Sequence, residues 1–477
     1  MITIVSQRVI HLRRRDHQTS ATNSVDITFV DCLVNHSEPS HPITSAIFTS
    51  NSSSFSSVLQ AYIRNLRFNT STTRKPLLVV TASHVSHVQA AIICGQKHKL
   101  LMKIRSGGHD YEGVSYVAQE PFFLLDMFNL RSTEIDMETE TAWVQAGATL
   151  GEVYYRIAEK SKNHGFPAGV CPTVGVGGHI SGGGYGNLMR KYGTSVDNVI
   201  DAQIVDVLGR LLNRRSMGED LFWAIKGGGG GSFGVVLAYK IRLVQHVAPT
   251  ISNDLFIRLI LDVANGTQIG TKTVRATFIA LFLGDSKSLV SLTNEKFPQL
   301  GLKQCDCIET SWVRSVLFRD NIDIATPLEI LLGRQPQSLK YLKRKSDYVK
   351  KTISKESWEG IWKKMIELEK GIMYFNPYGG RMAEIASTET PFPHRSGNLW
   401  KIQYQANWYE GGEEVTQYHI NLVRELHMYM TPFVSKNPRQ AFICYKDLDL
   451  GIQHHGFHSY FKGSAYGVNY FMDNFNR

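Results

Sequence analysis

The sequence is organised around residues 171–186, CPTVGVGGHISGGGYG, which hold seven glycines in sixteen positions. Glycine at this density removes side chains from a surface and lets the backbone adopt positive φ angles. Successive backbone amides can then surround phosphate oxygens. The pattern is not a Rossmann fingerprint, which follows a strand and opens a helix, because Cys-Pro-Thr precedes the glycines here. The stretch predicts a phosphate-bearing cofactor of another kind.

A second stretch, residues 105–116, reads RSGGHDYEGVSY and places His109 directly after a glycine pair. Cys171 stands at the head of the first stretch, so both side chains can approach a planar ligand closely. Taken alone, a histidine in a loop is more often structural or solvent-facing, and a single cysteine is more often a small buried apolar residue. The two motifs together favour a role in holding a cofactor.

The two stretches together resemble the berberine bridge enzyme-like family of plant flavoproteins, within the vanillyl-alcohol-oxidase group. The resemblance extends from about Asp31 to Arg477. It implies an α+β fold with a PCMH-type FAD-binding domain at 31–246 and an antiparallel-sheet substrate domain at 247–440. Residues 441–477 would return to the flavin domain, and residues 1–30 are expected to be disordered. It also implies FAD bound covalently through His109, to the 8α-methyl group, and Cys171, to C6.

The resemblance assigns a set of further cofactor-binding residues from the two motifs. These are Arg105, Ser106, Gly107, Gly108, Val174, Gly175, Gly177, Gly178, His179, Gly182, Gly183, Gly184 and Gly186. A run of five glycines at 227–231 lies between an apolar helix pattern and an apolar strand pattern. This position favours close approach to a cofactor over a flexible linker, and the family uses it to contact the adenosine diphosphate portion of FAD.

The catalytic residues implied by the resemblance are led by Tyr445, as the general base. The family pattern YxNY reads Phe442–Ile443–Cys444–Tyr445 here, so its first Tyr and its Asn are replaced. Lys401 is expected to activate Tyr445, because a nearby cation favours the phenolate. Gln403 shares a strand face with Lys401. Tyr185 and Tyr111 are expected to complete the catalytic group.

Two positions refine the activity that the resemblance implies. Gln403 stands where alkaloid-cyclising members carry a glutamate, and an amide cannot deprotonate a phenol, so the sequence favours oxidation of an alcohol. The substrate would be a carbohydrate lactol, with oligosaccharides included, or a monolignol-type allylic alcohol. Val174, three residues after Cys171, is expected to leave room for O₂, which makes the protein an oxidase that releases H₂O₂. The alternatives are a dehydrogenase that uses another acceptor and a non-catalytic secreted binding protein on the same scaffold.

Composition describes an ordinary globular protein of 477 residues, with 43% hydrophobic and 20% charged residues. No apolar run approaches the roughly 18 residues of a membrane span. The net charge of +10 is spread over short basic clusters, chiefly 13–15 and 340–345, which we interpret as solvated surface. No nucleic-acid motif accompanies them. We expect a monomer with no nucleic-acid partner.

Six cysteines occur, none in CxxC spacing, and no metal site is expected. The resemblance implies a disulfide between Cys32 and Cys94. Four N-glycosylation sequons begin at Asn35, Asn51, Asn69 and Asn265. A disulfide together with glycans indicates a secreted or cell-wall protein, although the first 30 residues lack the pattern of a signal peptide.

The secondary-structure pattern around the motifs is clear. A buried strand at 77–82, a helix capped by Ser83 and a strand that leads to His109 form a βαβ unit. Thr149 and Glu152 form a capping box for a helix that we expect to stop at Gly165. After Val247, apolar and polar residues alternate, which predicts an antiparallel sheet.

Overall fold

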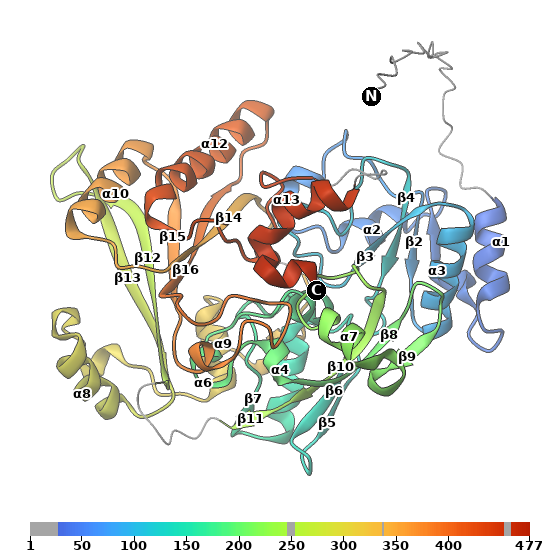
Figure 1. Cartoon of the computed structure of the whole chain (residues 1–477), viewed down its shortest axis with the longest axis horizontal. Coiled ribbons are helices and arrows are strands. Elements are labelled where there is room, and N and C mark those ends of the chain that lie inside the picture. Colours follow the sequence, from blue (N-terminus) through green and yellow to red (C-terminus); the bar gives the residue numbers. More distant parts are fainter. Residues whose placement is uncertain (1–26, 246–252, 336–337, 453–458) are drawn as a thin grey trace, which may run out of the picture.

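The computed structural model describes residues 27–245, 253–335, 338–452 and 459–477. Three large β-sheets organise these residues (Figure 1), two in the N-terminal half and one in the C-terminal half. The α+β, two-part architecture predicted from the sequence is therefore confirmed. Within the described ranges, no helix is both long enough and apolar enough to cross a membrane.

The first sheet has the order β1-β2-β4-β3, formed by β1 (Ile47–Thr49), β2 (Leu78–Thr81), β4 (Phe122–Asp126) and β3 (Leu101–Arg105). Strands β2, β4 and β3 are parallel, and α3 (Val85–Lys97) connects β2 to β3. The predicted βαβ unit is thus present, with β4 inserted between its two strands. The N-cap of α3 is His84 rather than Ser83, because the His84 ring nitrogen accepts the Ser86 backbone N–H.

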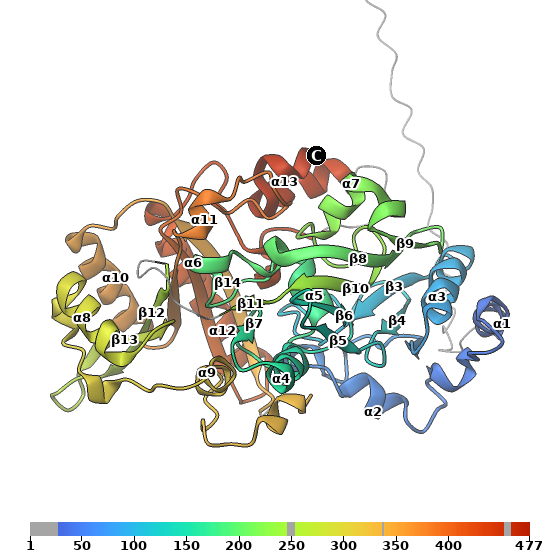
Figure 2. The ribbon, with the colours of Figure 1, turned by 90° about the horizontal axis from the view of Figure 1, so that it is seen from below.

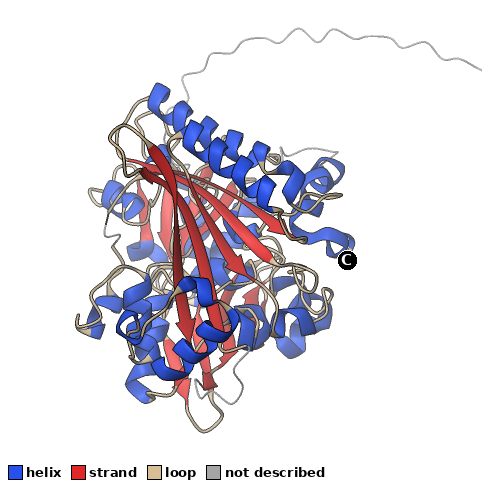
Figure 3. Ribbon diagram, turned by 90° about the vertical axis from the view of Figure 1, so that its left-hand side faces the viewer, coloured by secondary structure: helices blue, strands red, loops and turns tan. Residues whose placement is uncertain are grey.

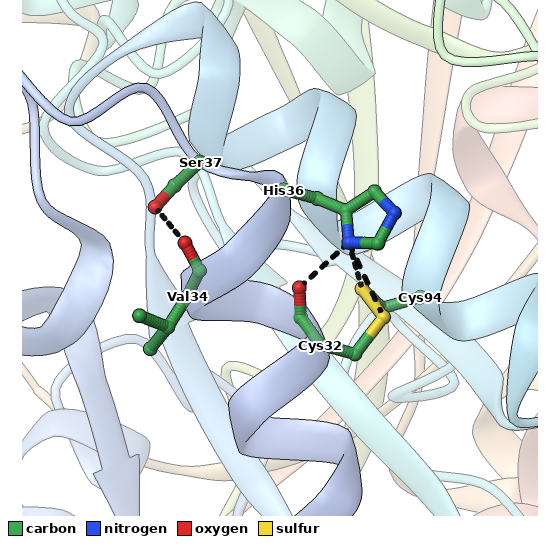
Figure 4. The surroundings of a disulfide bond; sticks show 5 residues. All are labelled: Cys32, Val34, His36, Ser37 and Cys94. Atoms are coloured by element: carbon green, nitrogen blue, oxygen red, sulfur yellow. Dashed lines mark hydrogen bonds between the residues drawn. A yellow bond between two sulfur atoms is a disulfide. The ribbon is translucent and has the colours of Figure 1, made fainter.

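Helix α1 (Ile27–His36) lies against α3 and is joined to it by the Cys32–Cys94 disulfide. Figure 4 shows the His36 ring over this bond, with Nδ1 3.6 Å and 3.8 Å from the two sulfurs. The predicted pairing is confirmed. Residues 27–30 were expected to be disordered but form the first turn of α1, because Phe29 packs into the core of this half. Residues 1–26, with the basic cluster at 13–15, lie outside the described residues.

The second sheet is antiparallel, with the order β5-β6-β10-β8-β9. Its strands are β5 (Thr133–Asp136), β6 (Thr141–Gln145), β10 (Val235–Arg242), β8 (Val199–Val205) and β9 (Leu211–Asn213). The helices of this region are α4 (Leu150–Lys160), α5 (Val176–Ser181), α6 (Met189–Tyr192) and α7 (Arg214–Ile225).

The capping box predicted at the start of α4 is confirmed, since Thr149 accepts from the Glu152 backbone and Glu152 accepts from the Thr149 backbone. The helix ends at Lys160 rather than continuing to Gly165. Its C-cap, Ser161, is extended with φ −152° and ψ 138°, and the chain then forms β7 (His164–Gly165), which pairs with β11 (Val244–Gln245).

The third sheet confirms the prediction from alternation and has the order β13-β12-β15-β16-β14. Its strands are β12 (Leu255–Asn265), β13 (Lys272–Phe282), β14 (Tyr341–Val349), β15 (Ile372–Pro377) and β16 (Trp400–Trp408). Helices α10 (Lys355–Leu368) and α12 (Glu413–Tyr429) bury one face of it (Figure 3). The opposite face turns toward the N-terminal half.

The chain between and after these strands crosses back to the N-terminal half. Helix α9 (Trp312–Arg319) packs on α4 (Figure 2). In this contact Trp312 meets Tyr154 edge to face, with the ring centres 4.8 Å apart. The remaining helices are α2 (Phe55–Gln60), α8 (Ser286–Lys296), α11 (Arg381–Glu384) and α13 (Ser459–Phe471). Near the C-terminus, the Asn474 side chain donates to the carbonyls of Ser387 and Thr390.

The interpretation of 340–345 as solvated surface is wrong. Lys343, Arg344 and Lys345 lie in β14 and are almost completely buried. Charged residues are found inside a protein when opposite charges pair with them, and both lysines here contact buried carboxylates. A run of basic letters looks the same in the sequence whether or not its carboxylate partners exist, because those partners come from distant segments.

Candidate active site

The two glycine-rich stretches meet at the C-terminal end of β3. A Cβ atom on Gly107 would lie 2.3 Å from the Gly175 backbone nitrogen, closer than real Cβ contacts allow. Side chains at these positions would therefore force the two loops apart, and glycine is required on both sides. The loop that carries His109 and the loop that follows Cys171 are held in direct backbone contact.

His109 is oriented by a single hydrogen bond, with 2.8 Å between its Nε2 and Thr173 Oγ1. Burial, followed by the charge of Arg64, lowers the pKa of His109 to about 3. The ring is therefore neutral at physiological pH. When its Nε2–H is donated to Thr173, the lone pair of Nδ1 is left for bonding to a ligand.

The Cys171 residue is exposed overall, unlike the disulfide-bonded cysteines, while its thiol lies beside the Asp320 carboxyl, and burial, followed by Asp320, raises the pKa of this thiol to about 12. Seven residues further on, a Cβ atom added to Gly178 would meet no protein atom within 4 Å. A cysteine at the surface, a neutral imidazole and bare backbone match what a flavin ring held by two side chains requires. The residues present fit FAD.

Several residues assigned to the cofactor instead pack against protein. The Arg105 guanidinium is buried, and it bonds to Asp126 and to the carbonyls of Val58 and Leu59. The Ser106 hydroxyl donates to the Ala146 carbonyl, and His179 Nε2 accepts from the Gly169 N–H. Cβ atoms on four glycines would lie within 3 Å of neighbouring protein: Gly182 (Cys444), Gly183 (Phe392), Gly184 (Ser195) and Gly186 (Ala168). These residues can offer only backbone atoms to a cofactor, or they fix the local packing.

A cavity of about 300 Å³ lies where the first two sheets meet. Residues of α3 and β3 form one side, and residues of the loop before β10, including Gly231, Ser232 and Gly234, form the other. The loop begins with Gly231, the last residue of the run of five glycines. The volume of the cavity is at the lower end of the range for small-molecule pockets. Sequence reasoning identified only the side of the cavity that the glycine-rich loop forms.

The five residues predicted to be catalytic come together on the face of the third sheet that turns toward the N-terminal half, where Lys401 and Tyr185 are buried. The Tyr111 and Tyr445 rings are 5.6 Å apart, and Gln403 Nε2 donates to the Tyr111 hydroxyl over 3.1 Å. Lys401 Nζ lies 3.3 Å from the centre of the Tyr185 ring and 4.4 Å from that of Tyr445. Residues from three connecting segments and from β16 thus form one aromatic, amide and amine cluster.

Lys401 is fully buried, and its Nζ has no hydrogen-bond partner among the described residues. Burial lowers its pKa well below the usual value for lysine. The amine is held by aromatic faces alone, an arrangement typical of cation–π contact. Lys401 is therefore poised to change its protonation state, rather than being a permanent cation.

Tyr445 has a second cation near it besides Lys401, namely Arg258. Burial raises the pKa of Tyr445 well above 10, and the neighbouring Tyr111 and Tyr185 raise it further, while Arg258 lowers it. Arg258 is on β12, donates from Nε to Asn376 Oδ1 over 2.7 Å and lies 3.3 Å from the Tyr185 hydroxyl. Sequence reasoning missed Arg258, and its only signal was a lone charge in the apolar strand LFIRLI.

The sequence of the chain is similar to those of known flavoproteins. Residues 76–214 match the family model described as FAD binding domain. The chain is 58% identical to "Berberine bridge enzyme-like 8" of Arabidopsis thaliana, over 96% of this chain and 92% of that protein. The chain belongs to the berberine bridge enzyme-like family.

Solved structures of this family agree in fold over nearly the whole chain. BBE-like #28 from Arabidopsis thaliana is 41% identical with a TM-score of 0.86, covering 94% of this chain and 95% of that one. A variant of berberine bridge enzyme is 32% identical with a TM-score of 0.86, covering 94% of each chain. The protein is thus an FAD-binding oxidoreductase, with the antiparallel sheet as the second part of the family fold.

Proposed function

We propose that this berberine bridge enzyme-like protein is an oxidase that converts an alcohol to a carbonyl compound and reduces O₂ to H₂O₂. The observation that carries the proposal is the cluster of Tyr111, Tyr185 and Tyr445 around Lys401, with Arg258 beside it. Such a group can accept a proton from a substrate hydroxyl inside a site screened from water. A non-catalytic binding protein does not require such a proton-accepting cluster.

In this proposal FAD is held covalently by His109 and Cys171, and bound FAD supplies the hydride acceptor. His109 bonds through Nδ1, since Nε2 is engaged by Thr173. Cys171 bonds through its sulfur, which must first lose its proton, and the neighbouring Asp320 carboxyl is placed to take it. The cavity beside Gly231 and Ser232 takes the adenosine portion.

Tyr445 acts as the general base and takes the proton of the substrate hydroxyl. The cost of forming a buried phenolate is offset by the Arg258 charge, which is the one that lowers its pKa. Lys401 is close enough to receive or balance this proton, because its Nζ lies 4.4 Å from the centre of the Tyr445 ring. Gln403 orients Tyr111 and offers an amide, not a carboxylate, to the substrate.

The substrate we favour is a carbohydrate lactol, with the allylic alcohol as the second candidate. Relatives 39–40% identical in sequence are described as Phl p 4, with glucose dehydrogenase activity in the wild type and glucose oxidase activity in an isoleucine-to-valine variant. Loss of one methylene group thus accompanies a change of acceptor in that protein. This supports our interpretation of Val174 as leaving space for O₂.

We further propose that the protein is a secreted monomer divided into domains near residue 246. The disulfide supports an oxidising compartment, and a relative described as a pollen allergen agrees with it. All four sequon asparagines are exposed, at Asn35, Asn51, Asn69 and Asn265. The third sheet lies entirely after residue 246, although α9 packs on the N-terminal half.

The test is the absorption spectrum of the purified protein before and after denaturing precipitation. Yellow colour that stays with the precipitate, and flavin-modified peptides around His109 and Cys171 in mass spectrometry, are expected. Single alanine variants of either residue should keep one linkage, and the double variant should release the flavin. A colourless protein would favour the non-catalytic binding protein, and a yellow one whose flavin stays reduced for minutes in air would be the dehydrogenase.

A further inference from the structure

The buried lysines of β14 belong to a cluster of charges that connects the two loops carrying Tyr111 and Tyr445. We call this cluster the ionic clamp. Its members are Glu112, Lys343, Lys345, Asp447 and Asp449. Four of the five side chains are at most 4% exposed, and Asp449 is 19% exposed. Charges buried to this degree are expensive in free energy unless they are paired, so the cluster demands an explanation.

Lys343 is the centre of the ionic clamp. Its Nζ lies 2.6 Å from Glu112 Oε1 and 2.8 Å from Asp447 Oδ1. One ammonium group therefore joins the loop after β3 to the segment after Tyr445. Lys345 contacts the second oxygen of Asp447 and lies 3.0 Å from Asp449 Oδ2.

Three further residues extend the network outward. Arg67 lies 3.4 Å from Glu112, and Arg424 of α12 binds Asp449 at 2.6 Å. The Tyr470 hydroxyl of α13 accepts the Asp447 backbone N–H at 3.0 Å. Segments from both halves of the molecule thus converge on a single group of charges.

The positions joined by Lys343 are adjacent in sequence to the tyrosines of the candidate active site. Glu112 directly follows Tyr111, and Asp447 is two residues after Tyr445. Tyr111 lies in a turn and Tyr445 ends a three-residue 3₁₀ helix, so neither has a long regular element to fix its place. Their rings are nevertheless held 5.6 Å apart, with Lys401 over Tyr445.

We infer that Lys343 is a positioning residue of the oxidation, which acts through Glu112 and Asp447 to hold Tyr111 and Tyr445 in working geometry. The inference rests on the proposed role of Tyr445 as base. Beyond that role, the inference identifies the residues that hold the base, Tyr445, in position. A displacement of about 1 Å is enough to cost roughly 10²-fold in rate when a reacting group must be aligned.

The experiment is a double-mutant cycle on the flavin-loaded protein. Lys343→Met and Tyr445→Phe are made singly and together, and flavin reduction by D-glucose is followed anaerobically, per mole of bound flavin. Lys343→Met is expected to slow reduction by about 10- to 10²-fold. In the Lys343→Met background, Tyr445→Phe should lower the rate of flavin reduction by less than about 10-fold, far less than it does in the wild type. The reason is that a base already displaced from the substrate contributes little to the rate.

Two further variants separate positioning from general stability. Lys343→Arg keeps the charge between the two carboxylates and should restore most of the rate. Lys364→Met is the matched control, since this lysine pairs with Glu367 and Glu425 on α10 and α12, away from the tyrosines. It should leave the rate unchanged. Multiplicative effects of Lys343→Met and Tyr445→Phe, or equal effects of Lys343→Met and Lys364→Met, would overturn the inference.

A crystal structure of the Lys343→Met holoprotein gives a readout that needs no substrate. The separation of the Tyr111 and Tyr445 rings is expected to change from 5.6 Å, and an unchanged pair would overturn the inference. If Lys343→Met does not fold, Glu112→Gln goes through the same cycle and crystallography, with the same criteria. If Tyr445→Phe alone leaves reduction unchanged, or glucose does not reduce the wild type, the proposed function fails instead, and the crystal structure still decides on the clamp.

Discussion

The glycine-rich loops and the strands β14 and β16 face the same site, but they are built from different materials. The loops around Gly107 and Gly175 are bare backbone in direct contact. The strands carry buried side chains with charge, among them Lys343 and Lys401. The first arrangement suits a large planar cofactor with phosphates, and the second suits proton transfer from a small substrate. Backbone shape is thus expected to determine cofactor binding, and buried charge is expected to determine proton transfer. Substitutions in the loops should therefore lower flavin content, whereas substitutions on the strand side should lower the rate of reduction.

The largest effect is expected where backbone meets backbone. Gly107→Ala should abolish flavin-loaded protein, because the new Cβ would lie 2.3 Å from the Gly175 nitrogen and neither loop can yield. Gly178→Ala is the matched control, since its Cβ would meet no protein atom within 4 Å. It should fold with an unchanged melting temperature and lose flavin content only. Flavin absorbance per mole of protein measures the flavin content, and thermal unfolding measures the melting temperature. A flavin-loaded Gly107→Ala protein would contradict the backbone contact.

On the side-chain half, removal of one hydroxyl should leave fold and flavin intact. Tyr445→Phe is expected to lower the rate of flavin reduction by about 10²- to 10⁴-fold, the usual contribution of a general base. Stopped-flow reduction measures it, with Tyr341→Phe as control, because that tyrosine begins β14 and its ring stacks on Trp408. An unchanged rate in Tyr445→Phe would mean that another group takes the proton.

An intermediate effect is expected at Val174, the position that we propose controls the electron acceptor. Val174→Leu should slow reoxidation by O₂ roughly 10-fold or more and leave reduction unchanged, since a close-packed interior does not absorb an added methylene freely. Reoxidation in air-saturated buffer is followed at the flavin absorbance. Equal slowing of both half-reactions would show that the change disturbs the flavin rather than the path of O₂.

The smallest effect is a shift of the pH profile that distinguishes the two cations near Tyr445. In the proposed mechanism Tyr445 must accept a proton during reduction, so the rate of reduction is expected to rise with pH through the apparent pKa of this group. Arg258 lowers the pKa of Tyr445, so Arg258→Met should move the profile to higher pH. Lys401→Met should move it in the same direction by less, because burial lowers the pKa of Lys401 itself. Profiles of reduction rate against pH for both variants provide the measurement, and a larger shift in Lys401→Met would reverse the assignment.

The sequence by itself determined the local features that depend on neighbouring residues. The capping box at Thr149, the alternation that predicts the third sheet and the glycine-rich motifs were all legible, because their signals lie within a few residues of one another. The resemblance then supplied the family, the Cys32–Cys94 disulfide and the five catalytic candidates, which the structure brings into one cluster.

Only the tertiary structure decided which charges are buried and what they face. Lys343 and Lys345 looked like surface because Glu112 and Asp447 lie more than one hundred residues away on either side. Arg258 is one letter in an apolar strand until the fold places it beside Tyr185. Similarly, Gly178 and Gly184 are equivalent in sequence, yet one faces open space and the other packs on Ser195. Burial and pairing of charges are sums over distant segments, so no local pattern contains them.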